Sequence, residues 1–359
     1  MATDPTAAMA PAAGETIDLR SDTVTAPTPD MYEAIARARL GDDGLDGDPT
    51  ARELEDVTAG LLGKQAGVYF PSATMANLAA IMAQAGRQEI VLAQEDSHIY
   101  CAERGGAGLS GAFYVPLPGN DGAMDTGRLH EALAANRSKL RTAVVCLENS
   151  HNSAGGTVLP LAYMEQVAGM AHLAGAVVHL DGARLFNAAT YLQMPAKAIA
   201  DHCDTVAVCL SKGLSAPMGA VLVGESATMA KARALRRALG GNQRQVGIAA
   251  AAGLVAIRSM TARLGEDHAS AARLSAGLRK IPALRVSMPQ TNIVLVDTAG
   301  TGQAAQAWAA LLRQRGVLVR PWGQSSLRCV THRHIGLADV DKAAAIFAGI
   351  AMIRPGQGG

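Results

Sequence analysis

Three side chains that could act in one reaction follow two apolar runs of the sequence. Asp181 and Arg184 follow the run at residues 177–180, and Lys212 follows the run at residues 206–210. Short apolar runs with many β-branched residues are typical of buried strands in a parallel sheet. Because ligands bind at the carboxyl ends of such strands, we expect the acid, the guanidinium and the amine to face one crevice.

This trio has a specific use in amino-acid chemistry. Lys212 could form a Schiff base with pyridoxal 5'-phosphate, and Asp181 could keep the pyridine nitrogen protonated so that the ring withdraws electrons. Arg184 could bind an amino-acid carboxylate through two parallel hydrogen bonds. Each motif alone could be a surface turn or a solvated loop, but their joint position after apolar runs favours a site for this cofactor.

The composition limits the class of protein. The 359 residues suffice for one large domain and a smaller one, and with 49% hydrophobic and 18% charged residues they are typical of a globular protein. A formal net charge of +1 gives no basic field that would attract nucleic acid or a membrane surface. We expect no signal peptide and no membrane span, because charges interrupt the long apolar stretches. Five cysteines without a CxxC pair indicate reduced thiols in the cytoplasm.

Apolar runs and helical segments alternate along most of the chain. Helices of ten or more residues between short strands favour an α/β fold with a doubly wound parallel sheet. From about residue 249 a long apolar helix and short strands indicate a small α+β domain instead. The expected division is a disordered tail at residues 1–16, a large cofactor-binding domain with an N-terminal arm at 17–248, a small domain at 249–353 and a tail at 354–359.

Other segments could complete the cofactor site. The helix expected after Pro71 begins with small hydroxylated residues, and a helix N-terminus binds anions such as a phosphate. His98 follows an expected strand, where it could stack on the pyridine ring and transfer protons. A glycine pair before Arg244 could reach a phosphate. The acidic loop at residues 41–50 lacks the ligand spacing of a calcium EF-hand, so we expect no metal site there.

Taken in order, these motifs resemble those of the L-threonine aldolases, which are pyridoxal-phosphate enzymes of the aspartate-aminotransferase fold (fold type I). The resemblance covers about residues 17–335. It implies a mainly parallel seven-stranded sheet in the large domain, and a homotetramer with active sites at the dimer interface. The matching segments are residues 19–25, 41–43, 48–50, 72–77, 148–152, 179–188, 210–214, 216–217, 240–241 and 244–245.

The resemblance also implies roles for individual residues. Lys212 matches the Schiff-base lysine, Asp181 the partner of the pyridinium nitrogen, and His98 the histidine that stacks on the ring. The residues that match the phosphate-binding segment are Ser72, Ala73 and Thr74, with Arg244 contributing from a neighbouring subunit. The residues that match the clamp for the substrate carboxylate are Ser21, Arg184 and Arg328.

The activity that the resemblance implies is the reversible cleavage of the Cα–Cβ bond of L-threonine or L-allo-threonine to glycine and an aldehyde. His98, His151 or a held water could remove the proton of the β-hydroxyl group, and the sequence does not choose among them. Two alternatives use the same fold: another pyridoxal-phosphate activity, such as transamination or β-elimination, and a binding or scaffold protein with an inactive site.

Two positions depart from the family pattern. Ala73 stands where the family usually has glycine, which could change the approach of the phosphate. Leu45 follows Gly44 where the family's acidic loop usually continues to a tyrosine. Because the loss of a phenol makes a pocket less polar, we expect a preference for aryl or larger apolar substrates such as L-phenylserine.

Overall fold

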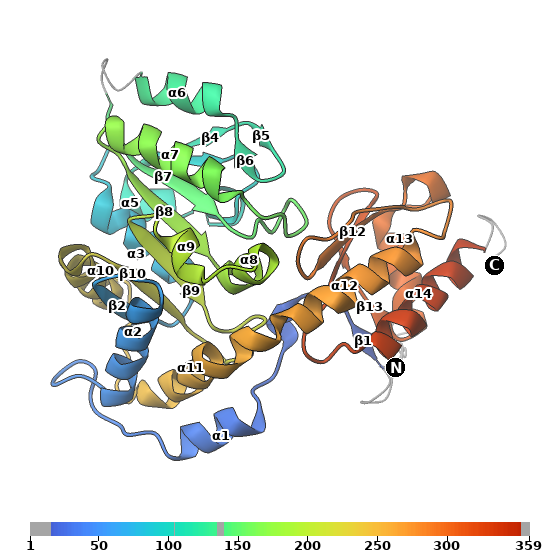
Figure 1. Cartoon of the computed structure of the whole chain (residues 1–359), viewed down its shortest axis with the longest axis horizontal. Coiled ribbons are helices and arrows are strands. Elements are labelled where there is room, and N and C mark those ends of the chain that lie inside the picture. Colours follow the sequence, from blue (N-terminus) through green and yellow to red (C-terminus); the bar gives the residue numbers. More distant parts are fainter. Residues whose placement is uncertain (1–15, 104, 135–139, 353–359) are drawn as a thin grey trace, which may run out of the picture. The chain divides into compact units, whose positions relative to one another are not determined.

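The computed structural model describes residues 16–103, 105–134 and 140–352, which form two compact units (Figure 1). The large unit is Thr25–Glu266. The small unit combines the N-terminal residues up to Val24 with the chain from Asp267 onward. Apart from Thr16, the two tails expected from the sequence lie outside the described residues.

The large unit is built on a seven-stranded sheet in which all strands but one run in the same direction. Strand β10 is antiparallel to both of its neighbours, and the other adjacent pairs are parallel. All residues of β7, β9 and β10 are buried, as expected for strands covered on both faces. The predicted mainly parallel sheet is confirmed. Its order is β2 (Ala66–Phe70), β10 (Ala220–Gly224), β9 (Thr205–Cys209), β8 (Val177–Gly182), β7 (Thr142–Glu148), β3 (Ile90–Gln94) and β4 (Phe113–Leu117).

Alternate residues of the strands enter different apolar clusters, so helices cover both faces of this sheet. Val206 and Val208 of β9 pack in one cluster with α2 (Pro49–Leu61), α7 (Leu161–Leu173), α8 (Leu185–Leu192), α9 (Ala196–Ala200) and α11 (Gly247–Ser259). Ala207 packs in another cluster with α3 (Ala73–Gln84) and α10 (Ser226–Ala238). The remaining elements of this unit are α1 (Pro29–Ala36), α4 (His98–Cys101), α5 (Gly106–Ser110), β5 (Gly119–Asn120), β6 (Ala123–Met124), α6 (Thr126–Ala134) and η3 (Met260–Arg263).

The small unit has an antiparallel sheet and its own core. In the sheet, β11 (Arg285–Val286), β12 (Ile293–Asp297), β15 (Ser326–Val330) and β14 (Arg320–Pro321) lie side by side in that order. Trp308 and Phe347 stack in the core with ring centroids 5.8 Å apart. These rings belong to α13 (Ala305–Gln314) and α14 (Leu337–Ala351). This unit is the α+β part of the predicted fold.

The division between the units differs from the predicted boundary at residue 249. Helix α11 belongs to the large unit, where it packs on α1 and α2, and the division falls within α12 (Leu264–Leu278). Near the other end of the chain, β1 (Ile17–Asp18) belongs to the small unit because it pairs in parallel with β13 (Val317–Leu318). Both differences arise from contacts between distant parts of the sequence: the packing of α11 on α1 and α2, and the pairing of β1 with β13.

One helical stretch of the described chain, Gly247–Leu278, is long and apolar enough to cross a membrane by length and composition alone. In its most apolar part, 61% of the residues are buried inside the protein. A core helix passes the same test, and the packing of α11 on α1 and α2 is that of a core helix.

Candidate active site

Asp181 and Lys212 lie at the carboxyl ends of two neighbouring strands. Asp181 is the next-to-last residue of β8, and Lys212 follows β9, which pairs with β8 in parallel. The Asp181 carboxylate is buried and accepts hydrogen bonds from the backbone N–H of Ala183 at 3.0 Å and from Asn77 Nδ2 at 3.1 Å. Lys212 is half-buried, and its ammonium makes no hydrogen bond or ion pair within the described residues. The structure therefore brings the acid and the amine of the predicted site together.

The environment of Asp181 destabilises the charged form of its carboxyl group. Burial raises the pKa of Asp181 to about 6, and the charges of Glu148 and Glu103 act in the same direction. The positive charges of Lys212 and His98 oppose this rise. A bound cation that donates a hydrogen bond to Asp181 would therefore stabilise its charged form.

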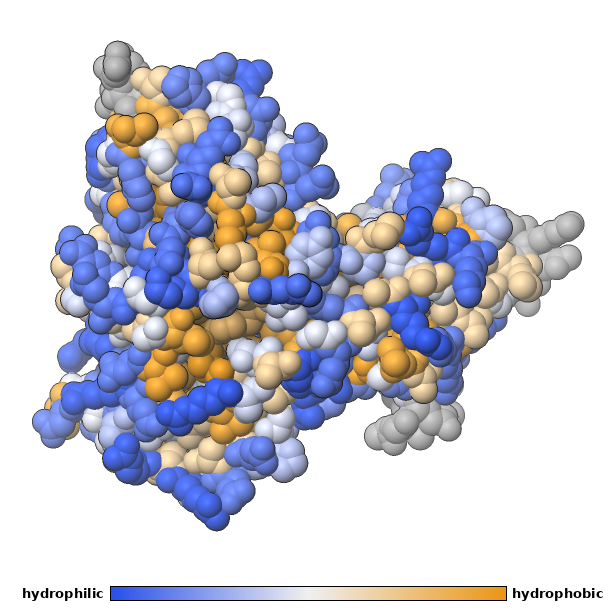
Figure 2. All heavy atoms as spheres, viewed as in Figure 1, coloured by the Kyte–Doolittle hydropathy of each residue, from blue (hydrophilic) through white to orange (hydrophobic). Residues whose placement is uncertain are grey.

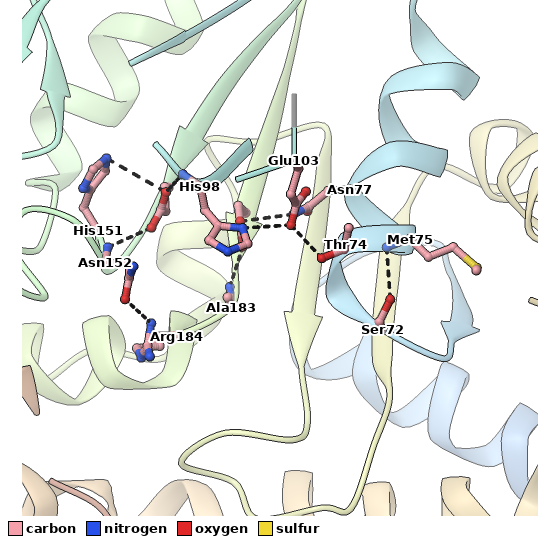
Figure 3. A network of polar contacts seen from close by, with 12 residues as sticks. Ser72, Thr74, Met75, Asn77, His98, Glu103, His151, Asn152, Ala183 and Arg184 are labelled. Carbon is pink, nitrogen blue, oxygen red and sulfur yellow. Dashed lines mark hydrogen bonds and ion pairs between the residues drawn. The ribbon is translucent and has the colours of Figure 1, made fainter. Parts of the chain in front are cut away.

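Glu103 joins His98 to the start of helix α3. The Nδ1 atom of His98 lies 2.8 Å from Glu103 Oε1, which also accepts a hydrogen bond from Thr74 Oγ1 at 2.9 Å (Figure 3). Asn77 donates to Glu103 Oε2 at 3.2 Å as well as to Asp181. The hydrogen bond to Glu103 raises the pKa of His98. His98, Asp181 and the predicted phosphate segment thus belong to one polar network.

Glu148, at the end of β7, connects a second set of side chains to this network. Its Oε2 accepts from the backbone N–H of His98 at 2.6 Å, and its Oε1 accepts from the backbone N–H of Asn152 at 2.7 Å (Figure 3). The Asn152 side chain accepts from Arg184 Nη1 at 3.1 Å, which orients the buried guanidinium. His151 Nε2 lies 3.9 Å from Glu148 Oε2.

The two candidate base histidines differ in access. His151 Nδ1 accepts a hydrogen bond from the backbone N–H of Ala154 at 3.2 Å, so its proton is on Nε2, which faces Glu148. The side chain of His151 is 1% exposed, whereas that of His98 is 38% exposed. In this structure a substrate could reach His98 but not His151.

The N-terminus of α3 has the features of an anion site. Ser72 caps the helix by accepting a hydrogen bond from the backbone N–H of Met75 at 3.2 Å. The backbone N–H groups of Ala73 and Thr74 make no hydrogen bond within the described residues. The Ala73 side chain packs against the apolar cluster between α3 and α10, so its methyl group is accommodated despite the departure from glycine. The free N–H groups fit the phosphate of pyridoxal 5'-phosphate. The half-buried Lys212 amine fits its aldehyde, and the buried Asp181 carboxylate fits its ring nitrogen.

Arg244 and Leu45 lie apart from this network on the surface of the large unit. Arg244 Nη1 is 3.5 Å from Asp42 Oδ1, and the Arg244 side chain is 68% exposed. Leu45 is 79% exposed in the same acidic loop. Within the described residues, no hydrogen bond links either side chain to Asp181 or His98. The roles predicted for these two residues therefore stay predictions.

Ser21 and Arg328 lie together on the small unit. Arg328 is 3% exposed, and its Nη2 donates to the carbonyl oxygen of Arg20, the residue before Ser21, at 3.2 Å. The guanidinium carbon of Arg328 lies 4.3 Å from the ring centroid of Trp322. The structure thus holds one face of the predicted carboxylate-binding arginine against an aromatic ring, a feature that the sequence analysis missed.

We expect Trp322→Leu to weaken binding of the substrate carboxylate. A cation–π contact is worth about 0.5–2 kcal/mol, so KM should rise by about 2- to 30-fold while kcat changes less. Trp322→Phe should restore most of the loss. Arg320, whose guanidinium lies 5.3 Å from the same ring, provides the matched control Arg320→Leu. A large fall in kcat at constant KM would contradict this role for Trp322.

Three residues that hold the predicted site together had no role assigned from the sequence: Asn77, Glu103 and Glu148. Glu148 ends a strand at the same edge of the sheet as Asp181, so the rule that identified Asp181 could have found it. Asn77 and Glu103 lie within α3 and after α4, and only their contacts in the fold reveal them.

Comparison with known proteins agrees with this geometry. Residues 18–301 match the family model described as beta-eliminating lyase. The chain is 40% identical to the probable low-specificity L-threonine aldolase 2 of Arabidopsis thaliana, with 92% of this chain and 96% of that protein covered. It is 37% identical to the low specificity L-threonine aldolase of Escherichia coli strain K12, with 92% and 97% covered.

A solved structure of threonine aldolase from Leishmania major shares the fold. Its TM-score is 0.81 at 19% identity, and the match covers 93% of this chain and 99% of that one. This similarity confirms the predicted fold class. The matched family model and the sequence relatives show that the chain belongs to the low-specificity L-threonine aldolases, within the beta-eliminating lyase family.

Proposed function

We propose that this protein is a pyridoxal-phosphate-dependent lyase that cleaves the Cα–Cβ bond of L-threonine or L-allo-threonine to glycine and an aldehyde, reversibly. The observation that carries the proposal is the half-buried Lys212 ammonium, which has no hydrogen bond or ion pair in the described chain and follows the strand next to that of the buried Asp181 carboxylate. Family membership supports it. The direct test is to incubate the purified protein with L-threonine and measure acetaldehyde and glycine in equal amounts.

Different residues of the large unit would bind different parts of the cofactor. When bound, pyridoxal 5'-phosphate supplies a conjugated ring that takes up the electron pair of the breaking bond. Asp181 would accept a hydrogen bond from the ring nitrogen, and the N-terminus of α3 would bind the phosphate through its free N–H groups. Lys212 would provide the amine that attaches the cofactor, and His98 would contact the ring.

Arg184 binds the substrate carboxylate, with Asn152 holding its guanidinium in position. On the small unit, Ser21 and Arg328 are the residues proposed to bind a carboxylate. Fixing the carboxylate sets the direction of the Cα–Cβ bond, which is an orientation effect on the rate. His98 then removes the proton of the β-hydroxyl group through Nε2, because its Nδ1–H donates to Glu103. The hydrogen bond to Glu103 raises the pKa of His98 and makes Nε2 a stronger base.

We expect L-phenylserine to be a better substrate than L-threonine, because Leu45 makes the acidic loop less polar than a tyrosine would. The measurement is kcat/KM for both substrates in the wild-type protein and in Leu45→Tyr. The variant should shift the ratio toward L-threonine by about tenfold or less, which is typical of one hydrogen bond. Met288→Tyr is a control at another exposed apolar residue. A strong preference of the wild type for threonine would remove the hypothesis.

The affinity of the protein for pyridoxal 5'-phosphate should fall as the pH is lowered through about 6. In this range Asp181, whose pKa burial raises to about 6, takes up a proton. Its neutral form is a weaker acceptor for the ring nitrogen. The dissociation constant can be measured by titrating apoprotein at several pH values. A constant affinity down to about pH 4 would show that Asp181 does not hold the ring.

Another pyridoxal-phosphate activity could use the same lysine and aspartate. The beta-eliminating lyase description of the matched family gives elimination particular weight as the second candidate. Assaying keto acid and ammonia alongside aldehyde and glycine separates the two. Keto acid as the main product from serine or threonine would favour elimination over aldol cleavage.

The enzyme works as a homotetramer in the cytoplasm, and two features support this part of the proposal. Figure 2 shows apolar side chains gathered on the visible face of the large unit. The same unit has an apolar groove of about 840 Å³ whose lining includes Phe186, Met194 and Ile257, and such patches are typical of surfaces that associate. No disulfide joins any of the five cysteines, all of which lie in the described chain, as in a reducing compartment. Light scattering of the holoenzyme measures the oligomeric state, and a monomer at working concentration would contradict it.

A further inference from the structure

His179 is a fully buried histidine on the same strand as Asp181 and on the same face. It precedes Asp181 by two residues in β8, and alternate residues of a strand point to the same side. Both ring nitrogens have partners: Nδ1 lies 2.9 Å from Thr205 Oγ1, and Nε2 lies 3.1 Å from Asn77 Oδ1. The proposed mechanism gives this ring no role.

The partners of His179 form a continuous chain of hydrogen bonds that ends at the two carboxylates. Gln84 Nε2 donates to Thr205 Oγ1 at 3.0 Å. The Thr205 hydroxyl can then donate to Nδ1 of His179, whose Nε2–H donates to the Asn77 carbonyl oxygen. The amide nitrogen of Asn77 donates to both Asp181 and Glu103. Every donor in this chain has an acceptor.

The direction of this chain is set at the Asn77 amide. If the amide were reversed, its carbonyl oxygen would face two carboxylates, and neither would receive a hydrogen bond from it. The reversed amide would also require His179 to carry its proton on Nδ1. The orientation of Asn77 and the tautomer of His179 are therefore coupled, and each fixes the other.

We propose that His179 and Asn77 are positioning residues for the cofactor: the Nε2–H form of His179 fixes the Asn77 amide so that its two N–H groups hold Asp181 and Glu103 as charged acceptors. The claim about the cofactor rests on the proposed function, whereas the claim about the tautomer does not. Burial lowers the pKa of His179 to about 4, which agrees with a neutral ring.

The tautomer can be measured without the cofactor. In long-range ¹H–¹⁵N spectra of histidine-labelled apoprotein, the imidazole of His179 should be protonated on Nε2 and should not titrate between about pH 5 and about pH 8. Its signals should be absent from the spectrum of His179→Phe. An Nδ1–H tautomer, or titration within this range, would overturn the proposal.

The effect on the cofactor is measured by titrating apoprotein variants with pyridoxal 5'-phosphate. We expect His179→Phe to bind about tenfold more weakly at neutral pH, and the loss of affinity on acidification to move to higher pH, because Asp181 loses a fixed donor. Thr205→Val should have a smaller effect in the same direction. This variant tests the series of hydrogen bonds if His179→Phe does not fold. Thr142→Val, at another buried threonine of the sheet, is the matched control and should match the wild type.

The two measurements separate the inference from the proposed function. If the wild type shows the expected tautomer but does not bind pyridoxal 5'-phosphate, the proposed function fails and the hydrogen-bond chain stands. The wild type could instead bind the cofactor with the same affinity and pH dependence as His179→Phe and Thr205→Val. In that case His179 only fills space, and the positioning role is wrong.

Discussion

Lys212→Ala is expected to lower kcat for aldol cleavage by about 10³-fold or more, because the amine that attaches the cofactor is lost. The visible absorbance of the lysine-attached cofactor should disappear in the same variant. The fold should be intact, since the Lys212 ammonium has no hydrogen bond or ion pair within the described residues and its removal breaks none there. Activity assays, absorbance spectra and melting temperatures of both proteins measure these three effects.

Two further variants sharpen this test. Lys212→Arg keeps a positive charge near Asp181 but cannot condense with an aldehyde, so it should be as inactive as the alanine variant. Lys231→Ala removes an exposed lysine of α10 and should be fully active. Wild-type turnover in Lys212→Ala would show that the reaction does not use this residue.

Asp181→Asn is expected to lower kcat/KM by about 10²–10³-fold, because removing one partner of a buried charge pair costs about 3–5 kcal/mol. The variant keeps the size of the side chain and removes only its charge. Asp201→Asn, at an exposed residue that pairs with Lys197 on α9, is the control and should have wild-type activity. Full activity of Asp181→Asn would exclude the ring-nitrogen contact as a source of catalysis.

The same substitution should not destabilise the apoprotein. Burial holds the pKa of Asp181 at about 6 in the folded state, above its ordinary value of 3.8, so the charged form is unfavourable there. The free energy of unfolding of the wild type therefore falls as the pH rises from about 4 to about 6. The asparagine variant has no such decrease. Above about pH 6 the variant should melt at the same temperature as the wild type or higher, and below about pH 4 the difference should vanish. A lower melting temperature at neutral pH would contradict this account.

The central sheet was predictable because its strands are short apolar runs that helices cover on both faces. Residues 177–180 and 206–210 were expected as strands on this basis; the first run lies within β8 and the second overlaps β9. Strand β4 was not expected, because Phe113–Leu117 lies at the edge of the sheet, is only partly buried and contains Pro116. The division falls after Glu266 and not at residue 249 because no local pattern reveals that α11 packs on α1 and α2.

The site was predictable where a residue follows a strand or starts a helix. Asp181 lies near the end of β8, Ser72 caps α3 and Lys212 follows β9, as expected, whereas His98 lies beyond β3 as the first residue of the short helix α4. The residues that support them were not predictable in this way. Asn77 reaches Asp181 across 104 positions of the chain, and it does so from the middle of a helix. Such contacts depend on how helices pack on the sheet, which hydrophobic periodicity alone does not specify.

The pairing of β1 with β13 has a consequence for synthesis on the ribosome. The first strand of the small unit emerges about 300 residues before its partner, because Ile17 pairs with Val317. During that interval the large unit, Thr25–Glu266, is fully translated and can fold, while the first strand waits without a partner. We expect the nascent chain to expose this strand to chaperones until the C-terminal part has been made.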